Sequence, residues 1–368
     1  MARREIHGNV WGICMNFSAT DETSTITRLS KTTDPYGLIN YELINMPSII
    51  TNLPIFGMKE YYFNGSTFEL VPGNSVRGYD ISTDSNSTQN NVHNTARTSK
   101  LQTSDIFIYI PEFFYQVYDD PINNKRYYYI ASESNDGLFL RHPGSNRYIG
   151  KYLMNVNKTT RSGVTTKYSI YNTNNYNPYN TFLNMTNSIA TCTSGNFRCL
   201  DIATYDAIIL LRLIENNRFS LNPMPGPSIY TTGTTDNIPV TTTSGIVAYY
   251  IQRTGYSNNN EHFKYNNIED IFLPGCTLIT GITEYNSKVY INLSNNNLIP
   301  TTDNISNYFT EIGSSSIMTN FSTGNRNIKK LKYFNNCKWL FYPDFDSQNS
   351  DCIKGVVNII SNDTESQI

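Results

Sequence analysis

Pairs of carboxylates are the first residues in this chain whose types and spacing could do chemistry. Two acids that flank a glycosidic bond can hydrolyse it, one as general acid and the other as nucleophile or base. The sequence offers four such pairs: Asp119 with Asp120, Glu133 with Asp136, Glu269 with Asp270, and Asp344 with Asp346. Neighbouring acids in a strand point to opposite faces, so Asp119–Asp120 and Glu269–Asp270 are poor pairs.

The pair Asp344 and Asp346 has a second interpretation. The two acids share a face if the segment is extended, and the run from Asp344 to Ser347 also has the oxygen-rich character of a calcium loop. A solvated loop is the plain alternative, because a two-residue pattern is a weak signal. We keep Asp344 and Asp346 as a weak calcium candidate and expect no resident cofactor.

Histidines and cysteines give little support for catalysis. The four histidines are far apart, and no Cys, Asp or Glu stands at metal-ligand spacing from any of them: His7, His93, His142 and His262. The six cysteines form no Cys-x-x-Cys motif, and we expect mostly buried free thiols: Cys14, Cys192, Cys199, Cys276, Cys337 and Cys352. Phosphate-loop and nucleophile-elbow motifs are also missing from the sequence, which predicts that the chain is not an enzyme.

Loops rich in tyrosine and asparagine are more informative. The segments 171–180 and 256–260 combine rigid amphipathic rings with adaptable amides, the chemistry of many recognition loops. Sugars suit the same set, although a composition bias over the whole chain explains it equally well. Tyr256, Asn258, Asn259 and Asn260 are the predicted receptor-binding residues, with Trp339 as a second aromatic platform if it is exposed.

The composition restricts the class of protein. The 368 residues include 28 Tyr and 18 Phe, with 16% charged residues and a net charge of -2, which favours an ordered chain with a polar surface. Nucleic-acid binding needs a basic stripe that this composition does not supply. The N-terminal residues lack an apolar core, and no stretch reaches membrane-spanning length, so we expect neither a signal peptide nor membrane insertion.

The order of polar and apolar residues predicts a β-rich α+β fold. Expected strands surround Trp11, run continuously over residues 106–115, and include 125–130 as a hairpin partner and 288–292. Residues 52–59 are predicted to form a turn and residues 75–100 a long exposed loop. One main helix is expected over 201–215, with Asp201 as its N-cap and Asn216–Asn217 at its end.

Several of these segments, taken in order, resemble phage tail and virion proteins with a C-type-lectin-like, formylglycine-generating-enzyme-like domain. The similar segments are Pro54–Lys59, Asp105–Tyr115, Gly137–Pro143, Tyr148–Tyr152, Asp201–Glu215 and Tyr265–Asp270. The resemblance implies a virion protein, often trimeric, that displays a lectin-like face. Residues 272–281 lack the family's tryptophans, and the C-terminal part lacks the variable-loop pattern of hypervariable adhesins.

The resemblance also implies a domain order and a function. We expect an N-terminal β segment for anchoring and assembly (1–60), a middle β-rich region with long loops (61–196) and a C-type-lectin-like domain (197–368). The expected function is that of a virion fibre or tail-tip protein, assembled in the host cytoplasm, that binds a bacterial surface glycan or protein. Its expected partners are other virion proteins and two further copies of itself.

Two alternatives stay open at this point. A purely structural head-fibre, collar or baseplate protein would share the same resemblance. A carbohydrate-active or formylglycine-type enzyme is a remote alternative, since a shared fold does not imply a shared activity. For the second alternative, Cys337 and Cys352 are the candidate redox pair, but their surroundings do not resemble the enzymes' site.

Overall fold

The computed structural model describes part of the chain, and strands predominate in that part. The described residues are 5–20, 22–41, 54–70, 105–150, 198–217, 264–265, 268–269, 277–294, 298, 300–314, 316–319, 330–344, 354–359 and 365–367. Within them, strands are accompanied by one long helix and a few short ones, which confirms the β-rich α+β class. Among the same residues, no helix is both long enough and apolar enough to cross a membrane.

The first sheet has five strands in the order β2-β1-β7-β6-β8. Its elements are β1 (Val10–Asn16), α1 (Glu22–Thr25), β2 (Ile26–Arg28), β6 (Phe114–Asp120), β7 (Lys125–Ala131) and β8 (Leu140–Arg141). Strands β6 and β7 form the predicted hairpin, and Asn124 takes the left-handed position of its turn at φ 52°. Strand β1 lies antiparallel to β7 along its whole length.

Both faces of β1 are buried, and successive side chains of the strand alternate between them. Trp11 and Ile13 point into the main core, whereas Val10 and Cys14 point into a second cluster on the other side. The segment after β2 supplies that second cluster with apolar side chains, including Leu38. Strand β1 is therefore a central strand of the molecule.

The second sheet has four strands in the order β4-β3-β5-β9. Its strands are β3 (Lys59–Phe63), β4 (Phe68–Leu70), β5 (Asp105–Ile110) and β9 (Arg147–Gly150), and the short helix η1 (Pro54–Phe56) leads into it. The turn predicted at 52–59 is confirmed over residues 54–58, and residues 52 and 53 lie outside the described part of the chain. The continuous strand predicted over 106–115 is wrong: β5 ends at Ile110, and the chain passes through Pro111 before β6 begins in the other sheet.

Proline explains this division of the segment. Pro111 has no backbone N–H to donate to a neighbouring strand and favours a change of direction. Phe113 is buried in the connection, so the apolar pattern continues although the strand does not.

The C-terminal half forms two larger sheets and a small hairpin. The five-stranded sheet has the order β14-β13-β12-β18-β19, in which β12 and β18 are parallel. Its strands are β12 (Thr277–Tyr285), β13 (Lys288–Ile291), β14 (Thr310–Gly313), β18 (Lys354–Ile359) and β19 (Glu365–Gln367). The other elements are β10 (Lys264–Tyr265), β11 (Ile268–Glu269), α7 (Ile305–Tyr308), β15 (Ser316–Thr319), β16 (Lys330–Tyr333) and β17 (Phe341–Asp344).

The long helix α5 (Ile202–Asn216) confirms the helix predicted at 201–215. Asp201 caps its N-terminus by accepting a hydrogen bond from the Thr204 N–H, and Asn217 ends it in the left-handed conformation at φ 52°. The predicted core residues Leu210, Leu211 and Ile214 are fully buried. Residues 202–215 are all buried, including the charged Asp206, Arg212 and Glu215, so other elements surround the helix.

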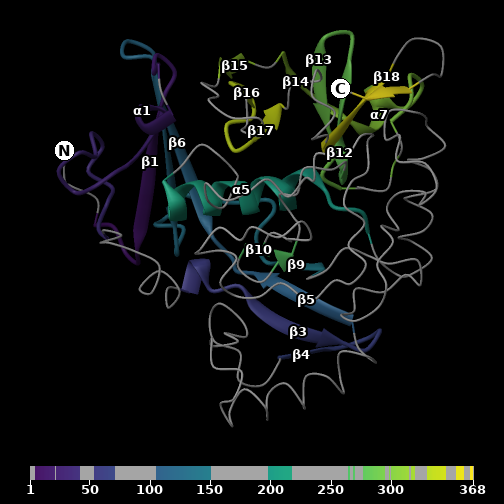
Figure 1. Ribbon diagram of the computed structural model, residues 1–368, viewed down its shortest axis with the longest axis horizontal. Coiled ribbons are helices and arrows are strands. Elements are labelled where there is room, and N and C mark those ends of the chain that lie inside the picture. The colour runs from purple at the N-terminus through teal and green to yellow at the C-terminus, as the bar shows by residue number, and fades with distance from the viewer. Residues whose placement is uncertain are drawn as a thin grey trace, which may run out of the picture.

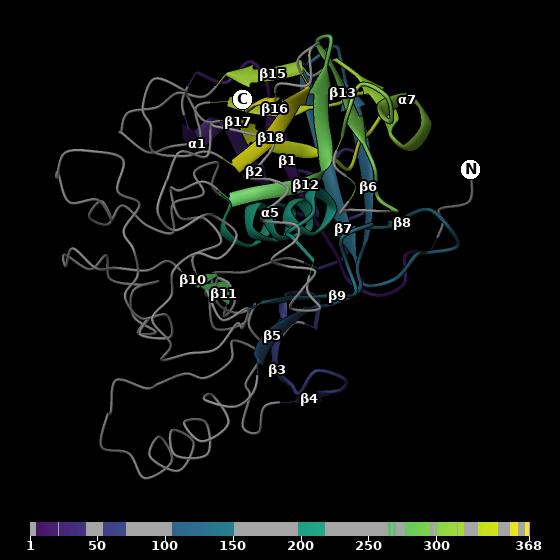
Figure 2. The ribbon, with the colours of Figure 1, turned by 90° about the vertical axis from the view of Figure 1, so that its right-hand side faces the viewer.

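Helix α5 lies between the sheets (Figure 1 and Figure 2). The sheet that contains β3 and β5 is on one side of it, and β12 and β18 are on the other. The helix also contacts β1 and β17. The described parts of the three predicted regions therefore share one main core, which extends from Trp11 to Leu340.

Candidate functional site

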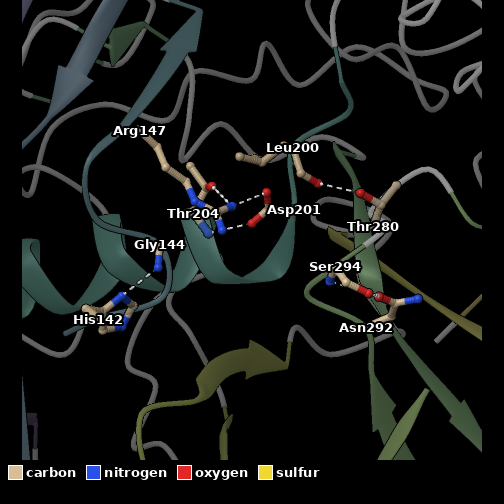
Figure 3. A network of polar contacts seen from close by, with 9 residues as sticks. All are labelled: His142, Gly144, Arg147, Leu200, Asp201, Thr204, Thr280, Asn292 and Ser294. Atoms are coloured by element: carbon tan, nitrogen blue, oxygen red, sulfur yellow. Dashed lines mark hydrogen bonds and ion pairs between the residues drawn. The ribbon is translucent and has the colours of Figure 1, made fainter. Parts of the chain in front are cut away.

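A polar network holds β9 against the N-terminus of α5 (Figure 3). The Arg147 guanidinium donates to the Asp201 carboxylate at 2.6 Å and to the Thr204 hydroxyl at 3.2 Å. The other oxygen of Asp201 accepts from the Thr204 backbone N–H at 2.8 Å. Asp201 thus caps the helix and binds the first residue of β9 at the same time, so helix and strand are fixed relative to each other.

The loop before β9 lies directly on the first turn of α5. Gly144 is buried there, and a Cβ atom at this position would be 1.8 Å from the backbone oxygen of Ala203. The Gly144 N–H donates to Nδ1 of His142 at 3.1 Å. Since Nδ1 accepts, the ring hydrogen is on Nε2, which faces the Asp206 carboxylate at 3.3 Å.

His142 is an uncharged part of the core. Its side chain is fully buried; it stacks on Phe113 at a centroid distance of 4.8 Å and meets the edge of Trp339 at 5.6 Å. Burial lowers the pKa of His142 to about 3, and the positive charge of Arg147 acts in the same direction. The ring therefore stays neutral and serves as a hydrogen-bonded link between the loop and helix α5.

Strand β9 connects this network to the opposite face of its sheet. Arg147 and Ile149 lie on the side of helix α5, and Tyr148 between them points the other way, as the period of two in a strand requires. Tyr148 is paired in register with Tyr109 of β5. The same contacts that anchor β9 to the core therefore position an outward-facing aromatic residue.

Six aromatic side chains share this outward face of the four-stranded sheet, and we call them the aromatic surface. Its members come from all four strands: Tyr61, Phe63, Phe68, Phe107, Tyr109 and Tyr148. The register places Tyr61 opposite Phe107 and Phe63 opposite Phe68. Each of the six rings contacts at least two others.

Ring stacking joins the two edge strands of the sheet. Phe68 of β4 lies parallel to Tyr148 of β9, with centroids 3.8 Å apart and planes at 7°. Tyr61 meets Tyr148 edge to face at 5.4 Å. Parallel and edge-to-face arrangements are the favoured geometries of aromatic pairs, so the rings hold one another in place.

The aromatic surface is partly open to solvent. Phe68 and Tyr148 are each 38% exposed, and Leu70 extends the apolar area at 44% exposure. Burial raises the pKa of Tyr148, with Tyr61 and Tyr109 adding to the effect, so its hydroxyl is neutral at physiological pH. The Tyr109 hydroxyl donates to the Asn146 side-chain oxygen at 2.7 Å.

The structure locates the sequence-predicted receptor residues only in part. Tyr256 and Asn258–Asn260 lie outside the described residues, as do the tyrosine-rich segment 171–180 and the loop 75–100. Trp339 is buried at 8% exposure against His142, so it does not meet the condition of exposure that a platform requires. Asp344 ends β17, while Asp346 is outside the described residues.

The carboxylates of the candidate pair Asp119 and Asp120 have structural partners. Burial acts to raise the pKa of Asp119, but hydrogen bonds and ion pairs with Arg126 and Lys338 outweigh it and lower that pKa. Asp120 instead accepts from Asn123. The two acids thus point to different partners, as the strand geometry predicts.

Three of the six cysteines are described, and all three are free and buried: Cys14, Cys199 and Cys337. Burial raises the pKa of Cys337 to about 12, with Asp206 contributing, so the thiol remains protonated. Among the described residues, no group of three or more His, Cys, Asp or Glu is arranged to hold a metal ion.

Sequence reasoning missed the aromatic surface. A signal was present, because aromatic residues stand at both 61 and 63 and at both 107 and 109, two positions apart as on one face of a strand. The continuous-strand interpretation of 106–115 hid this alternation by treating every residue there as buried. Sequence reasoning also missed the contact between His142 and Asp206, because these two residues are 64 positions apart in the chain.

Comparison of the chain with models of protein families, with characterised proteins and with solved structures finds no match. The arrangement of its own residues therefore has to support any assignment of function.

Proposed function

We propose that this chain is a virion protein of a bacteriophage, a fibre or tail-tip subunit that attaches the particle to the bacterial surface. The observation that carries this proposal is the aromatic surface. A contiguous apolar patch on a protein surface usually marks an interaction site, whereas single exposed apolar residues are common on any protein. Its rings are fixed by one another and by the anchored strand β9, so binding costs little conformational entropy.

The sequence resemblance supports the same proposal. The similar segments Pro54–Lys59 and Asp201–Glu215 coincide with the entry to the second sheet and with helix α5. The similar segment Gly137–Pro143 contains β8 and the start of the loop on that helix. A C-type-lectin-like domain over residues 197–368 and a location in the virion are part of this proposal. The loop around Tyr256 is its second proposed contact region.

A purely structural virion protein is the second candidate. The same aromatic surface could be covered by a neighbouring virion protein, which would make it an assembly interface. An enzyme is less favoured, because the protonated, buried thiol of Cys337 is a poor nucleophile and a poor redox partner.

Substitutions in the phage test the proposal. Particles with Phe68→Ala and Tyr148→Ala should assemble normally and adsorb poorly to host cells. Particles with Tyr256→Ala and Asn259→Ala should behave in the same way if the second region also contacts the receptor. Normal adsorption of both double variants would contradict the adhesive function, and failed assembly would assign the chain to the structural class.

The proposal includes self-association as a homotrimer. The family resemblance and the aromatic excess of a chain with only 16% charged residues both favour an assembly larger than one chain. Sedimentation equilibrium of the purified chain at micromolar concentration should give three times the monomer mass. A stable monomer would contradict this part of the proposal.

A further inference from the structure

We propose that the aromatic surface binds an uncharged polysaccharide through the pyranose rings of its sugars. This inference rests on the proposed adhesive function and names the chemistry of the receptor. The central residues are Phe68 and Tyr148, which stack across the two edge strands and are the most exposed rings of the surface. Tyr61 contacts Tyr148 edge to face.

Electrostatic complementarity is the first reason. The face of an aromatic ring is negative and its edge is positive. The C–H groups on the flat side of a pyranose carry small positive charges, so a sugar ring and an aromatic face attract each other without any ionised group. The six rings offer this kind of contact: three are phenylalanines, and burial raises the pKa of Tyr109 and of Tyr148.

Charged groups of both signs lie beside the aromatic surface, which is the second reason. On the same face of the sheet the register places Lys59 opposite Tyr109 and Asp105 opposite Phe63. Glu112 and Arg141 form an ion pair at 2.9 Å next to Tyr109, and the influence of Glu112 on the pKa of that tyrosine opposes that of Arg141. An anionic polymer would need a cluster of unpaired basic residues. The local balance of charge thus fits a neutral ligand better than an anionic one.

Polar groups at the border of the aromatic surface complete the fit. A sugar that stacks on a ring has hydroxyl groups around its edge, and these need hydrogen-bond partners. The hydroxyls of Tyr61 and Tyr148 and the amide of Asn146 are of this kind. The Tyr109 hydroxyl fixes the Asn146 amide by donating to its oxygen, which orients the amide nitrogen as a donor.

Affinity electrophoresis of the purified full-length protein tests the inference. Surface polysaccharide from the host bacterium is separated by ion exchange into neutral and anionic fractions, and each is cast into a native gel. The neutral fraction should retard the protein. Phe68→Ala with Tyr148→Ala should weaken this binding at least tenfold, whereas Tyr148→Phe should keep it because the ring remains.

Tyr308→Ala is the matched control, since Tyr308 is a tyrosine 62% exposed on α7, away from the aromatic surface. It should bind as the unsubstituted protein does. Circular dichroism checks the fold of each variant. If the double variant does not fold, tyrosine fluorescence of the unsubstituted protein decides: the neutral fraction should change it, and no change would overturn the inference.

The remaining outcomes separate this inference from the proposed function. Retardation by the anionic fraction alone, or by neither fraction, overturns the proposal of an uncharged polysaccharide. If phage with the double substitution still adsorb poorly, and host cells lose adsorption after protease but not after periodate, the adhesive function stands with a protein receptor. Normal adsorption by that phage overturns this inference. Normal adsorption by the phage with Tyr256→Ala and Asn259→Ala as well overturns the proposed function itself.

Discussion

Gly144 shows how one residue controls the contact between the loop at 142–147 and helix α5. The loop approaches so closely that a Cβ atom would overlap the carbonyl oxygen of Ala203, and this oxygen belongs to helical backbone that cannot move alone. Close approach of two backbones is one of the few situations that require glycine. Any side chain at this position has to separate the loop from the helix.

Gly144→Ala should therefore lower the free energy of unfolding by about 3 kcal/mol or more, measured by urea denaturation. Gly137→Ala is the matched control. Gly137 has φ +79° and open space around it, so an alanine there meets only the left-handed backbone penalty of about 1–2 kcal/mol. Equal effects of the two substitutions would show that the close contact at Gly144 is wrong.

His142 gives a prediction for the pH dependence of stability. Its pKa is about 3 in the folded protein and 6.5 as the unperturbed value, so between these values the unfolded chain binds a proton that the folded chain does not. The contribution of neutral, buried His142 to the free energy of unfolding is complete above pH 6.5 and is lost as the pH falls towards 3. From pH 6.5 to pH 5 the loss should be roughly 2 kcal/mol.

Urea denaturation at both pH values, with His142→Gln as the control, measures this effect. Glutamine can donate a hydrogen bond but does not titrate, so the variant should lose less stability on acidification than the unsubstituted protein does. If both lose the same amount, His142 is not buried in its neutral form.

At the scale of elements, helix α5 organises the molecule. It contacts strands from the N-terminal and C-terminal halves, and its polar links to the loop at 142–147 hold β9, which in turn positions Tyr148. Its apolar residues leave no solvent-facing stripe. The stability of the helix therefore depends on packing from several directions rather than on helix propensity.

Leu211→Ala tests this packing. Leu211 is fully buried, and truncation of a buried leucine costs about 2–5 kcal/mol because it removes apolar contacts and leaves a cavity. Leu140→Ala is the control, since Leu140 is 58% exposed and should cost less than about 1 kcal/mol. Thermal unfolding followed by circular dichroism would reveal the difference. An unchanged melting temperature in Leu211→Ala would contradict the burial of Leu211 in the core.

At the scale of the whole molecule, the main core joins both ends of the described chain. Trp11 lies in the N-terminal sheet and Trp339 lies just before β17, and both belong to the same core. The sequence contains only these two tryptophans, so each can report on its own end of the chain. A shared core predicts a single cooperative transition.

Two variants measure whether the ends unfold together. Trp339→Phe leaves Trp11 as the reporter, and Trp11→Phe leaves Trp339. Urea unfolding of each, followed by tryptophan fluorescence and by circular dichroism, should give coincident transitions within each variant. A fluorescence transition that precedes the loss of secondary structure in either variant would show that this end unfolds as a separate unit.

Local features of the fold could be predicted from the sequence. The period of 3.6 in 201–215, with Asp201 before it and two asparagines after it, specifies helix α5, because capping and amphipathicity are properties of consecutive residues. The β6–β7 hairpin follows from its asparagine turn in the same way. The C-terminal end of β5 does not follow from the apolar run at 106–115, because Pro111 ends the strand although the apolar residues continue.

What the sequence by itself determined is the class of fold, its one long helix and its near-neutral charge. Only the tertiary structure decided that β1 is central, that Trp339 is buried against His142, and that six aromatic residues meet on one face of a sheet. The physical reason is separation along the chain. Propensity and periodicity act between near neighbours, whereas Phe68 and Tyr148 are brought together by strand order and register, which depend on the packing of the entire core.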